Sequence, residues 1–213
     1  MSITIICTGN PVSSPVGKYS SEGFDRAVSA AQASGILPYS GRKFDPAGRS
    51  VLLGEGRLAA ETAAQLILPG EFRIEALLNE IPVRSFTDTE KLYPVETWYR
   101  KAASQRKHGD PRQPESREQV IARAEALLDM ISDTDCILVA GPLFLGELLD
   151  RLRIHNYVIQ RTGVLKIQPL ERFVISRKEE HCGGCQHNCF LSNPGCGVGR
   201  DKAMRRRSSS SAG

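Results

Sequence analysis

The sequence lacks any apolar run approaching the ~20 residues that a membrane-spanning helix requires. Its first residues, Met-Ser-Ile-Thr-Ile-Ile-Cys-Thr-Gly, lack the basic start of a secretory signal peptide and have the β-branched composition of a strand. Hydrophobic residues make up 40% of the chain and charged residues 24%, which is ordinary for a globular protein. We therefore expect a cytoplasmic protein that makes no contact with a membrane.

Residues 1–176 also lack net charge, because they contain 21 basic and 21 acidic side chains. The formal charge of +4 comes from residues 177–213, chiefly from Lys202, Arg205, Arg206 and Arg207. Aromatic residues, which stack on bases in many nucleic-acid binders, are missing there apart from Phe190. Nucleic acid is therefore the least favoured partner, and residues 201–213 are expected to form a basic, Ser-rich disordered tail.

Cysteine is scarce outside one short segment. Of the six cysteines, four lie within fifteen residues, with the spacing C-x2-C-x3-C-x6-C. They are Cys182, Cys185, Cys189 and Cys196. Thiolates this close, separated by glycines that let the backbone turn round an ion, predict a single metal centre. Four thiolates suit either tetrahedral zinc or an iron–sulfur cluster, and the sequence does not fix which. His181 and His187 are possible substitutes for a thiolate.

Two other interpretations of the cysteine segment remain open. It could hold two disulfides, which is disfavoured because the chain is large enough to need no staples and shows no secretory signal. Cys182 and Cys185 could instead form a redox-active thiol pair. If zinc is bound, four thiolates leave no open coordination position, which indicates a structural or sensing role.

Hydrophobic periodicity and turn residues predict alternating strands and helices. Strands are expected at residues 2–8, 49–53, 72–77, 136–140, 164–168 and 172–176. Helices are expected at residues 21–34, 57–67, 94–107, 116–131 and 143–152. The alternation predicts an α/β fold, a three-layer α/β/α sandwich with a mostly parallel sheet, over residues 1–176. The small four-cysteine metal-binding element over residues 177–200 and the tail would follow it.

Four motifs, in this order, resemble the histidine phosphatase superfamily, the phosphoglycerate-mutase-like group. Residues 7–10, Cys-Thr-Gly-Asn, stand where the family has Arg-His-Gly-Glu. Residues 19–27 are similar to its first helix start, and residues 53–63, which contain Glu-Thr-Ala, to its second. Residues 114–116, Pro-Glu-Ser, lead through a long helix to residues 138–142, where the family has Val-x-His-Gly. The resemblance covers residues 2–176.

The departures from the family pattern bear on activity. The resemblance places the nucleophilic histidine on Thr8, its neighbouring arginine on Cys7 and the second histidine on Gly141. The second phosphate-binding arginine falls on Leu58, with Arg57 one position away. Covalent phosphoryl transfer needs a nitrogen nucleophile and cationic groups round the phosphate. We therefore expect a catalytically degenerate protein.

Three charged residues remain as candidates for a residual pocket: Arg57, Glu80 and Glu115. For the two glutamates we favour a helix cap and a surface carboxylate. Cys7 and Cys136 are expected to be core residues. The aromatic residues near position 95 either line a cleft or, as we favour, pack the irregular segment onto the sheet. These are Tyr93, Trp98 and Tyr99.

The preferred hypothesis is a metal-binding pseudo-phosphatase with a binding, regulatory or redox-sensing role. Its partner would be another protein or a small anionic ligand held by the backbone and hydroxyl groups of residues 8–17. The alternatives are a phosphohydrolase with a non-standard active site and an iron–sulfur redox protein. The sequence predicts no oligomeric state.

Overall fold

The computed structural model describes residues 2–161 and 166–177, so the predicted metal element and tail lie outside the described residues. The chain divides into two units, and unit 1, Met1–Lys178, is the one described here. None of its described helices combines the length and the apolar character that crossing a membrane demands.

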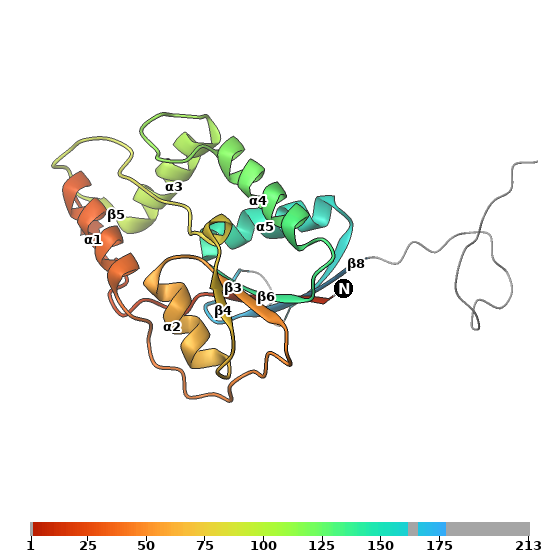
Figure 1. The fold of residues 1–213 in the computed structure, drawn as a ribbon. Coiled ribbons are helices and arrows are strands. Elements are labelled where there is room, and N and C mark those ends of the chain that lie inside the picture. The colour runs from red at the N-terminus through yellow and green to blue at the C-terminus, as the bar shows by residue number, and fades with distance from the viewer. Residues whose placement is uncertain (1, 162–165, 178–213) are drawn as a thin grey trace, which may run out of the picture. The chain divides into compact units, whose positions relative to one another are not determined.

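A six-stranded sheet forms the centre of the unit, with the order β4-β3-β6-β1-β8-β7 (Figure 1). Its strands are β1 (Ser2–Cys7), β3 (Ser50–Leu53), β4 (Phe72–Ile74), β6 (Cys136–Ala140), β7 (Tyr157–Arg161) and β8 (Arg172–Arg177). The first four in the spatial order pair in parallel, and β8 and β7 run antiparallel to their neighbours. A separate pair joins β2 (Lys18–Tyr19) to β5 (Tyr93–Pro94). The predicted mostly parallel sheet is confirmed.

The two central strands explain this arrangement. All five residues of β6 are buried, and so are five of the six in β1. Strands that are apolar on both faces need a layer on each side, which is typical of parallel sheets. Ile3 pairs with Cys136 and Cys7 with Ala140, so both strands end at the same edge of the sheet.

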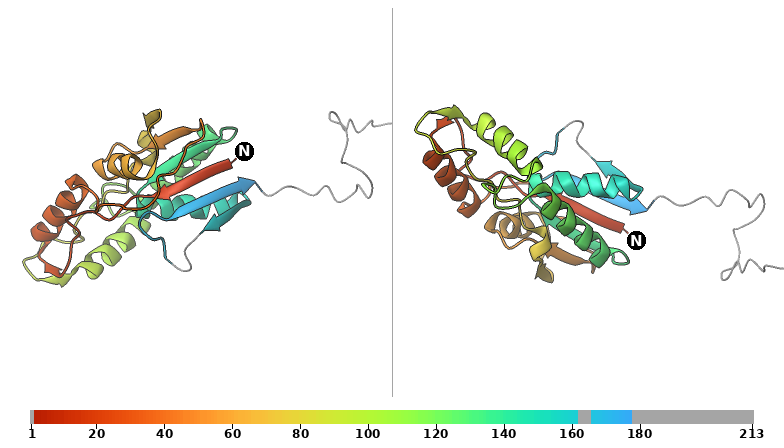
Figure 2. Two further views of the ribbon diagram at one scale, coloured as in Figure 1. Left: turned by 90° about the horizontal axis from the view of Figure 1, so that it is seen from below. Right: turned by 90° about the horizontal axis from the view of Figure 1, so that it is seen from above.

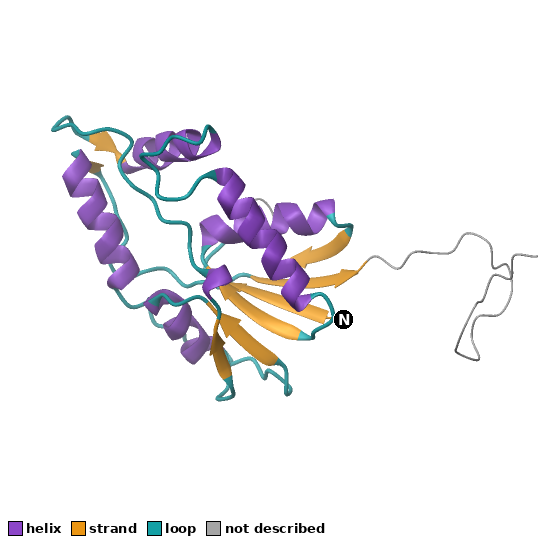
Figure 3. Ribbon diagram, turned by 45° about the horizontal axis from the view of Figure 1, so that its top comes forward, coloured by secondary structure: helices purple, strands orange, loops and turns teal. Residues whose placement is uncertain are grey.

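Helices cover both faces of the sheet. The described helices are α1 (Ser21–Ala33), α2 (Arg57–Leu66), α3 (Val95–Lys107), α4 (Arg117–Ile131) and α5 (Pro142–Ile154), with a 3₁₀ turn, η1 (Ala76–Leu78), and of these α2, α4 and α5 pack against the sheet. Helices α4 and α5 lie on one face of the sheet and α2 lies on the other (Figure 3). One hydrophobic core joins α4 and α5 to Ile5 and Leu138, and a second joins α2 to Ile6 and Val139. Because neighbouring residues of a strand point to opposite faces, these two cores form three layers.

A third cluster lies beyond the carboxyl ends of the strands, where α1 and α3 run side by side (Figure 2). The rings of Phe24 and Trp98 stack with centroids 5.4 Å apart, and Tyr99 meets Phe24 edge-on at 5.3 Å. The indole Nε1–H of Trp98 donates to the carbonyl of Tyr19 at 3.0 Å. The favoured interpretation of these aromatic residues is therefore wrong, because they pack α3 against α1 and not onto the sheet.

The predicted strand at residues 164–168 is also wrong in its described part, because residues 166–168 form no strand. The edge strand β7 lies a few residues earlier, and no strand was predicted there. In β7 half-buried and exposed residues alternate and none is fully buried, so the short run Tyr-Val-Ile-Gln-Arg gives little hydrophobic signal. The strand expected at 72–77 ends at Ile74 and gives way to η1.

Candidate functional site

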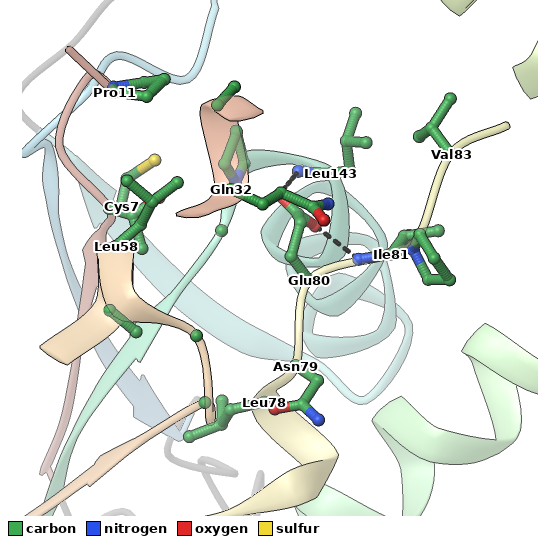
Figure 4. A pocket seen from close by; sticks show the side chains of 18 of the residues that line it. Cys7, Pro11, Gln32, Leu58, Leu78, Asn79, Glu80, Ile81, Val83 and Leu143 are labelled. Atoms are coloured by element: carbon green, nitrogen blue, oxygen red, sulfur yellow. Dashed lines mark hydrogen bonds between the residues drawn. The ribbon is translucent and has the colours of Figure 1, made fainter. Parts of the chain in front are cut away.

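A cavity of about 900 Å³ opens at the carboxyl ends of β1, β3 and β6 (Figure 4). Its lining includes residues 7–10 after β1, residues 54–56 after β3 and Gly141 after β6. Side chains of α1, α3 and α4 complete it, among them Gln32, Tyr99 and Arg123. Ligand sites of α/β proteins are usually found at this edge of the sheet, and the volume is typical of small-molecule pockets.

The structure brings most of the sequence-predicted positions together here. Cys7, Thr8, Leu58 and Gly141 all line this cavity, as do Glu80 and Glu115. Arg57 is the exception. Its side chain is 62% exposed and donates to Glu61 Oε1 at 2.7 Å and to the carbonyl of Ala33 at 3.3 Å. Arg57 thus lies outside the lining and does not replace the arginine expected at Leu58.

Glu80 binds the first turn of α5. That helix begins at Pro142, which has no N–H, so its unsatisfied donors in the first turn are the amides of Leu143 and Phe144. Leu143 donates to Glu80 Oε2 at 3.0 Å (Figure 4), and Phe144 donates to Glu80 Oε1 at 2.8 Å. The amide of Ile81 donates to Oε1 at 2.8 Å. Glu80 is therefore a helix cap, for a helix that begins more than sixty residues later.

Gly141 makes this contact possible. A Cβ atom at position 141 would lie far inside van der Waals contact with Oε2 and the carboxyl carbon of Glu80. A histidine, which the resemblance implies here, cannot share this space with the Glu80 carboxylate. The capping position of the Glu80 carboxylate therefore requires a residue without a side chain at position 141.

Arg123 is the arginine in the described cavity lining, and four of its five N–H donors are already engaged. It forms a two-pronged pair with Glu115, with Nε and Nη2 each 2.9 Å from a carboxylate oxygen. Its Nη1 donates to the carbonyls of Leu77 at 3.0 Å and Asn79 at 2.6 Å. Glu115 is only 16% exposed and pairs with Arg123, so neither the helix cap nor the surface carboxylate favoured for the two glutamates describes it. Neither Glu55 nor Glu80 has a cation of the described lining as a hydrogen-bonding partner, and Glu80 is attracted only at longer range by Arg123 and by Arg106, which lies outside the lining.

Neither cavity-facing group after β1 is activated for nucleophilic attack. Burial raises the pKa of the Cys7 thiol to about 12, and Glu80 and Glu171 add to the shift. Burial and then Asp135 raise the pKa of Cys136 to about 11, which agrees with a core role for both cysteines. Thr8 is 6% exposed and would need a base to lose its proton.

The two described histidines lie elsewhere. His108 Nδ1 is 2.7 Å from the carbonyl of Ser104, at the end of α3. His155 Nε2 is 2.6 Å from Glu125 Oε2, in a contact between α5 and α4. The side chain of His155 is 48% exposed, so this contact with Glu125 lies at the surface. Neither histidine lines the cavity.

Sequence reasoning missed four polar residues of the lining: Gln32, Glu55, Asn79 and Arg123. For Tyr99 the sequence left a cleft position as the less favoured alternative, and the residue does line the cavity. Burial, followed by Glu80, raises the pKa of its hydroxyl. Arg123 sits in the middle of an amphipathic helix, where a charged residue is indistinguishable from a solvated one. No local pattern marks these residues, because the cavity assembles them from separate elements.

Metal binding by the cysteine segment stays a prediction. Within residues 2–161 and 166–177, no three His, Cys, Asp or Glu side chains come together to hold an ion. The predicted ligands Cys182, Cys185, Cys189 and Cys196, with the substitutes His181 and His187, fall outside that part of the chain.

No family model matches this chain, and no curated protein matches it. Among solved structures, it is similar to the product of the open reading frame Rv3214 from Mycobacterium tuberculosis. The identity is 13%, over 84% of this chain and 92% of that one, with a TM-score of 0.49. Mycobacterial hydrolase 2 matches at 17% identity over 71% of each chain, with a TM-score of 0.40. Mycobacterial hydrolase 1 matches at 19% identity over 71% of this chain and 78% of that one, with a TM-score of 0.38. Likenesses at this level carry no inference about chemistry, which has to come from the cavity itself.

Proposed function

We propose that this protein is a catalytically degenerate relative of the histidine phosphatases that binds a small ligand in its cavity without hydrolysing phosphate esters. Its four-cysteine segment would bind zinc or an iron–sulfur cluster and give it a regulatory or redox-sensing role. The two parts of the proposal rest on different observations and are tested separately.

The observation that carries the first part is the lack of a free cation among the described residues of the cavity lining. A phosphoryl group needs several charge-assisted donors. Arg123 directs four of its five guanidinium N–H groups to Glu115 and two carbonyls. Glu55 and Glu80 would repel a phosphate in a cavity of low polarity. The small anionic ligand expected from the sequence is disfavoured for the same reason.

A phosphatase assay tests this part. We expect the full-length protein to release no phosphate or phenolate from p-nitrophenyl phosphate above the blank, with or without added zinc. The matched variants are Thr8→Val, which keeps the shape of the side chain without its hydroxyl, and Glu80→Gln. Turnover by the wild type that is lost in either variant would overturn the proposal in favour of a phosphohydrolase with a non-standard active site.

Metal content and an ultraviolet–visible spectrum, on protein purified without oxygen, test the second part. One zinc per chain and no colour would support a structural or docking element. Iron, sulfide and a broad band near ~400 nm, as thiolate-bound clusters give, would support redox sensing and would also favour the alternative of a redox protein. Finding neither metal would overturn metal binding and return the cysteines to disulfide or thiol chemistry.

The variant Cys185→Ser sharpens that measurement. Unit 1 has its own hydrophobic cores on both faces of its sheet. We therefore expect the variant to lose its metal while the circular dichroism spectrum stays that of the folded domain. Global unfolding would show instead that the metal is integral to unit 1.

A further inference from the structure

We propose that the ligand of the cavity is a small apolar amine, with a hydrocarbon body and one protonated nitrogen that binds Glu80. This inference rests on the proposed function, because it assigns the ligand class of the same cavity. Three features of the lining support it: its apolar walls, the sign of its charge, and the acceptor site left open on Glu80.

The walls of the cavity are mostly hydrocarbon. The apolar residues that line it include Val28, Ala31, Leu58, Leu78, Ile81 and Val83. Leu58 and Val83 are among the side chains that Figure 4 shows around the cavity. An apolar ligand body that leaves water for such walls gains roughly 25 cal/mol for each Å² of surface buried. Walls of this kind favour a ligand whose bulk is uncharged.

The charge of the lining selects the sign of any charged group on the ligand. Two helix N-termini, which attract anions when they are free, begin at this cavity, and each is already accompanied by a carboxylate. Glu55 lies just before α2, and Glu80 caps α5. Arg123 and Glu115 neutralise each other, and Arg106, which lies outside the lining, attracts Glu80 and Glu115 from α3. With Glu55 and Glu80 the described lining remains negative. An ammonium group is attracted there and a phosphate is repelled.

Glu80 has an acceptor position left for a ligand. Its Oε1 accepts two N–H groups, from Ile81 and Phe144, and its Oε2 accepts one, from Leu143. A carboxylate oxygen accepts about two hydrogen bonds, so Oε2 retains one site. Glu80 and Gly141 both line the cavity, so a ligand bound there lies beside this carboxylate.

The energetic state of Glu80 agrees with this role. Burial raises its pKa despite the three N–H donors and the more distant Arg123. Those donors therefore do not fully compensate the ionised carboxylate. An ammonium donating to Oε2 adds a charge-assisted hydrogen bond and supplies the opposite charge.

Three ligands with the same body test the proposal: 4-phenylbutylamine, 4-phenylbutanol and 4-phenylbutyl phosphate, each titrated calorimetrically into the full-length protein at pH 7. We expect the amine to bind about tenfold more tightly than the alcohol, as one charge-assisted hydrogen bond allows, and the phosphate to bind least. Glu80→Gln should remove the advantage of the amine and leave the alcohol unchanged. Glu55→Gln is the matched control and should reduce amine binding less than about threefold, because exposed charges are screened.

Each outcome separates this inference from the proposed function. Equal binding of amine and alcohol, with no effect of Glu80→Gln, would overturn the amine assignment and leave a ligand-binding cavity. Tightest binding of the phosphate would overturn both. If none of the three binds, the cavity is not the ligand site and the proposed function fails with the inference.

A measurement on the wild type keeps the test valid if Glu80→Gln fails to fold. In amide-resolved nuclear magnetic resonance spectra, the amine should shift the signals of Leu143 and Phe144, whose N–H groups contact Glu80, and the alcohol should shift them less. Equal shifts with both ligands would contradict a bond to this carboxylate.

Discussion

The helices α4 and α5 pack against each other on the same face of the sheet, yet their N-termini are capped in opposite ways. Helix α4 is capped from within its own sequence, because Ser116 Oγ accepts from the Gln119 amide and Gln119 Oε1 accepts from the Ser116 amide. Helix α5 begins at Gly141 and Pro142, which offer no side-chain acceptor, and takes its cap from Glu80.

The cap of α4 is purely structural, whereas the cap of α5 also forms part of the cavity wall. The cap of α4 is an exposed pair, and water can replace it at low cost. The cap of α5 is a largely buried carboxylate in the wall of the cavity, held by three amides and facing a glycine. A carboxylate placed in this way stabilises the helix start and gives the cavity its charge.

Among the variants that test this difference between the two caps, Glu80→Ala should have the largest effect on stability. Removing the carboxylate leaves the amides of Leu143 and Phe144 without their acceptor in a largely buried place, which costs about 2–3 kcal/mol of the free energy of unfolding. Urea denaturation followed by circular dichroism measures this change. A loss no larger than that of an exposed cap would show that water replaces the carboxylate freely.

Gly141→Ala disrupts the same contact by changing the glycine, and we expect it to lower the free energy of unfolding by about 2 kcal/mol. The added methyl group displaces the carboxylate from its three donors. Gly56→Ala is the matched control, because Gly56 is also an N-cap without a side-chain bond and a Cβ there meets nothing within 4 Å. When Glu80→Ala is already present, the cost of Gly141→Ala should fall to that of the control, and full additivity of the two changes would refute the shared contact.

Ser116→Ala measures how much the local cap of α4 contributes to stability. It removes the side-chain acceptor of a capping box that is open to solvent, and we expect a loss of about 1 kcal/mol in the same urea titration. Ser116→Asp should restore most of the stability, because aspartate caps helices as well as serine does. A loss larger than that of Glu80→Ala would reverse the ranking of the two caps.

The smallest effect is the pH dependence of the Glu80 cap. Since burial raises the pKa of Glu80 above its ordinary value of 4.5, the folded protein holds this proton more tightly than the unfolded chain. The stability of the wild type relative to Glu80→Gln should therefore increase as the pH falls through the folded pKa toward 4.5. Parallel urea titrations of the two proteins at several pH values measure the difference, and an increase with rising pH would contradict the shift.

Much of the fold could be predicted from the sequence because it depends on neighbours along the chain. The continuous apolar run at residues 136–140 is a buried strand, as predicted, and Ser116 begins α4. The sequence was least informative where the burial pattern is weak, as in the edge strand Tyr157–Arg161. Of the candidate site, the sequence supplied the positions Thr8, Leu58 and Gly141, but not their surroundings.

The sequence by itself determined the alternating α/β order, the core strands and the local caps, and it identifies the cysteine segment as the candidate metal site. Only the tertiary structure decided that Glu80 caps α5, that Arg123 is neutralised by Glu115, and that both face one cavity. The reason is the range of the interactions. A helix cap or an apolar alternation is set within about four residues, whereas the charge of a cavity depends on side chains that only chain packing brings together.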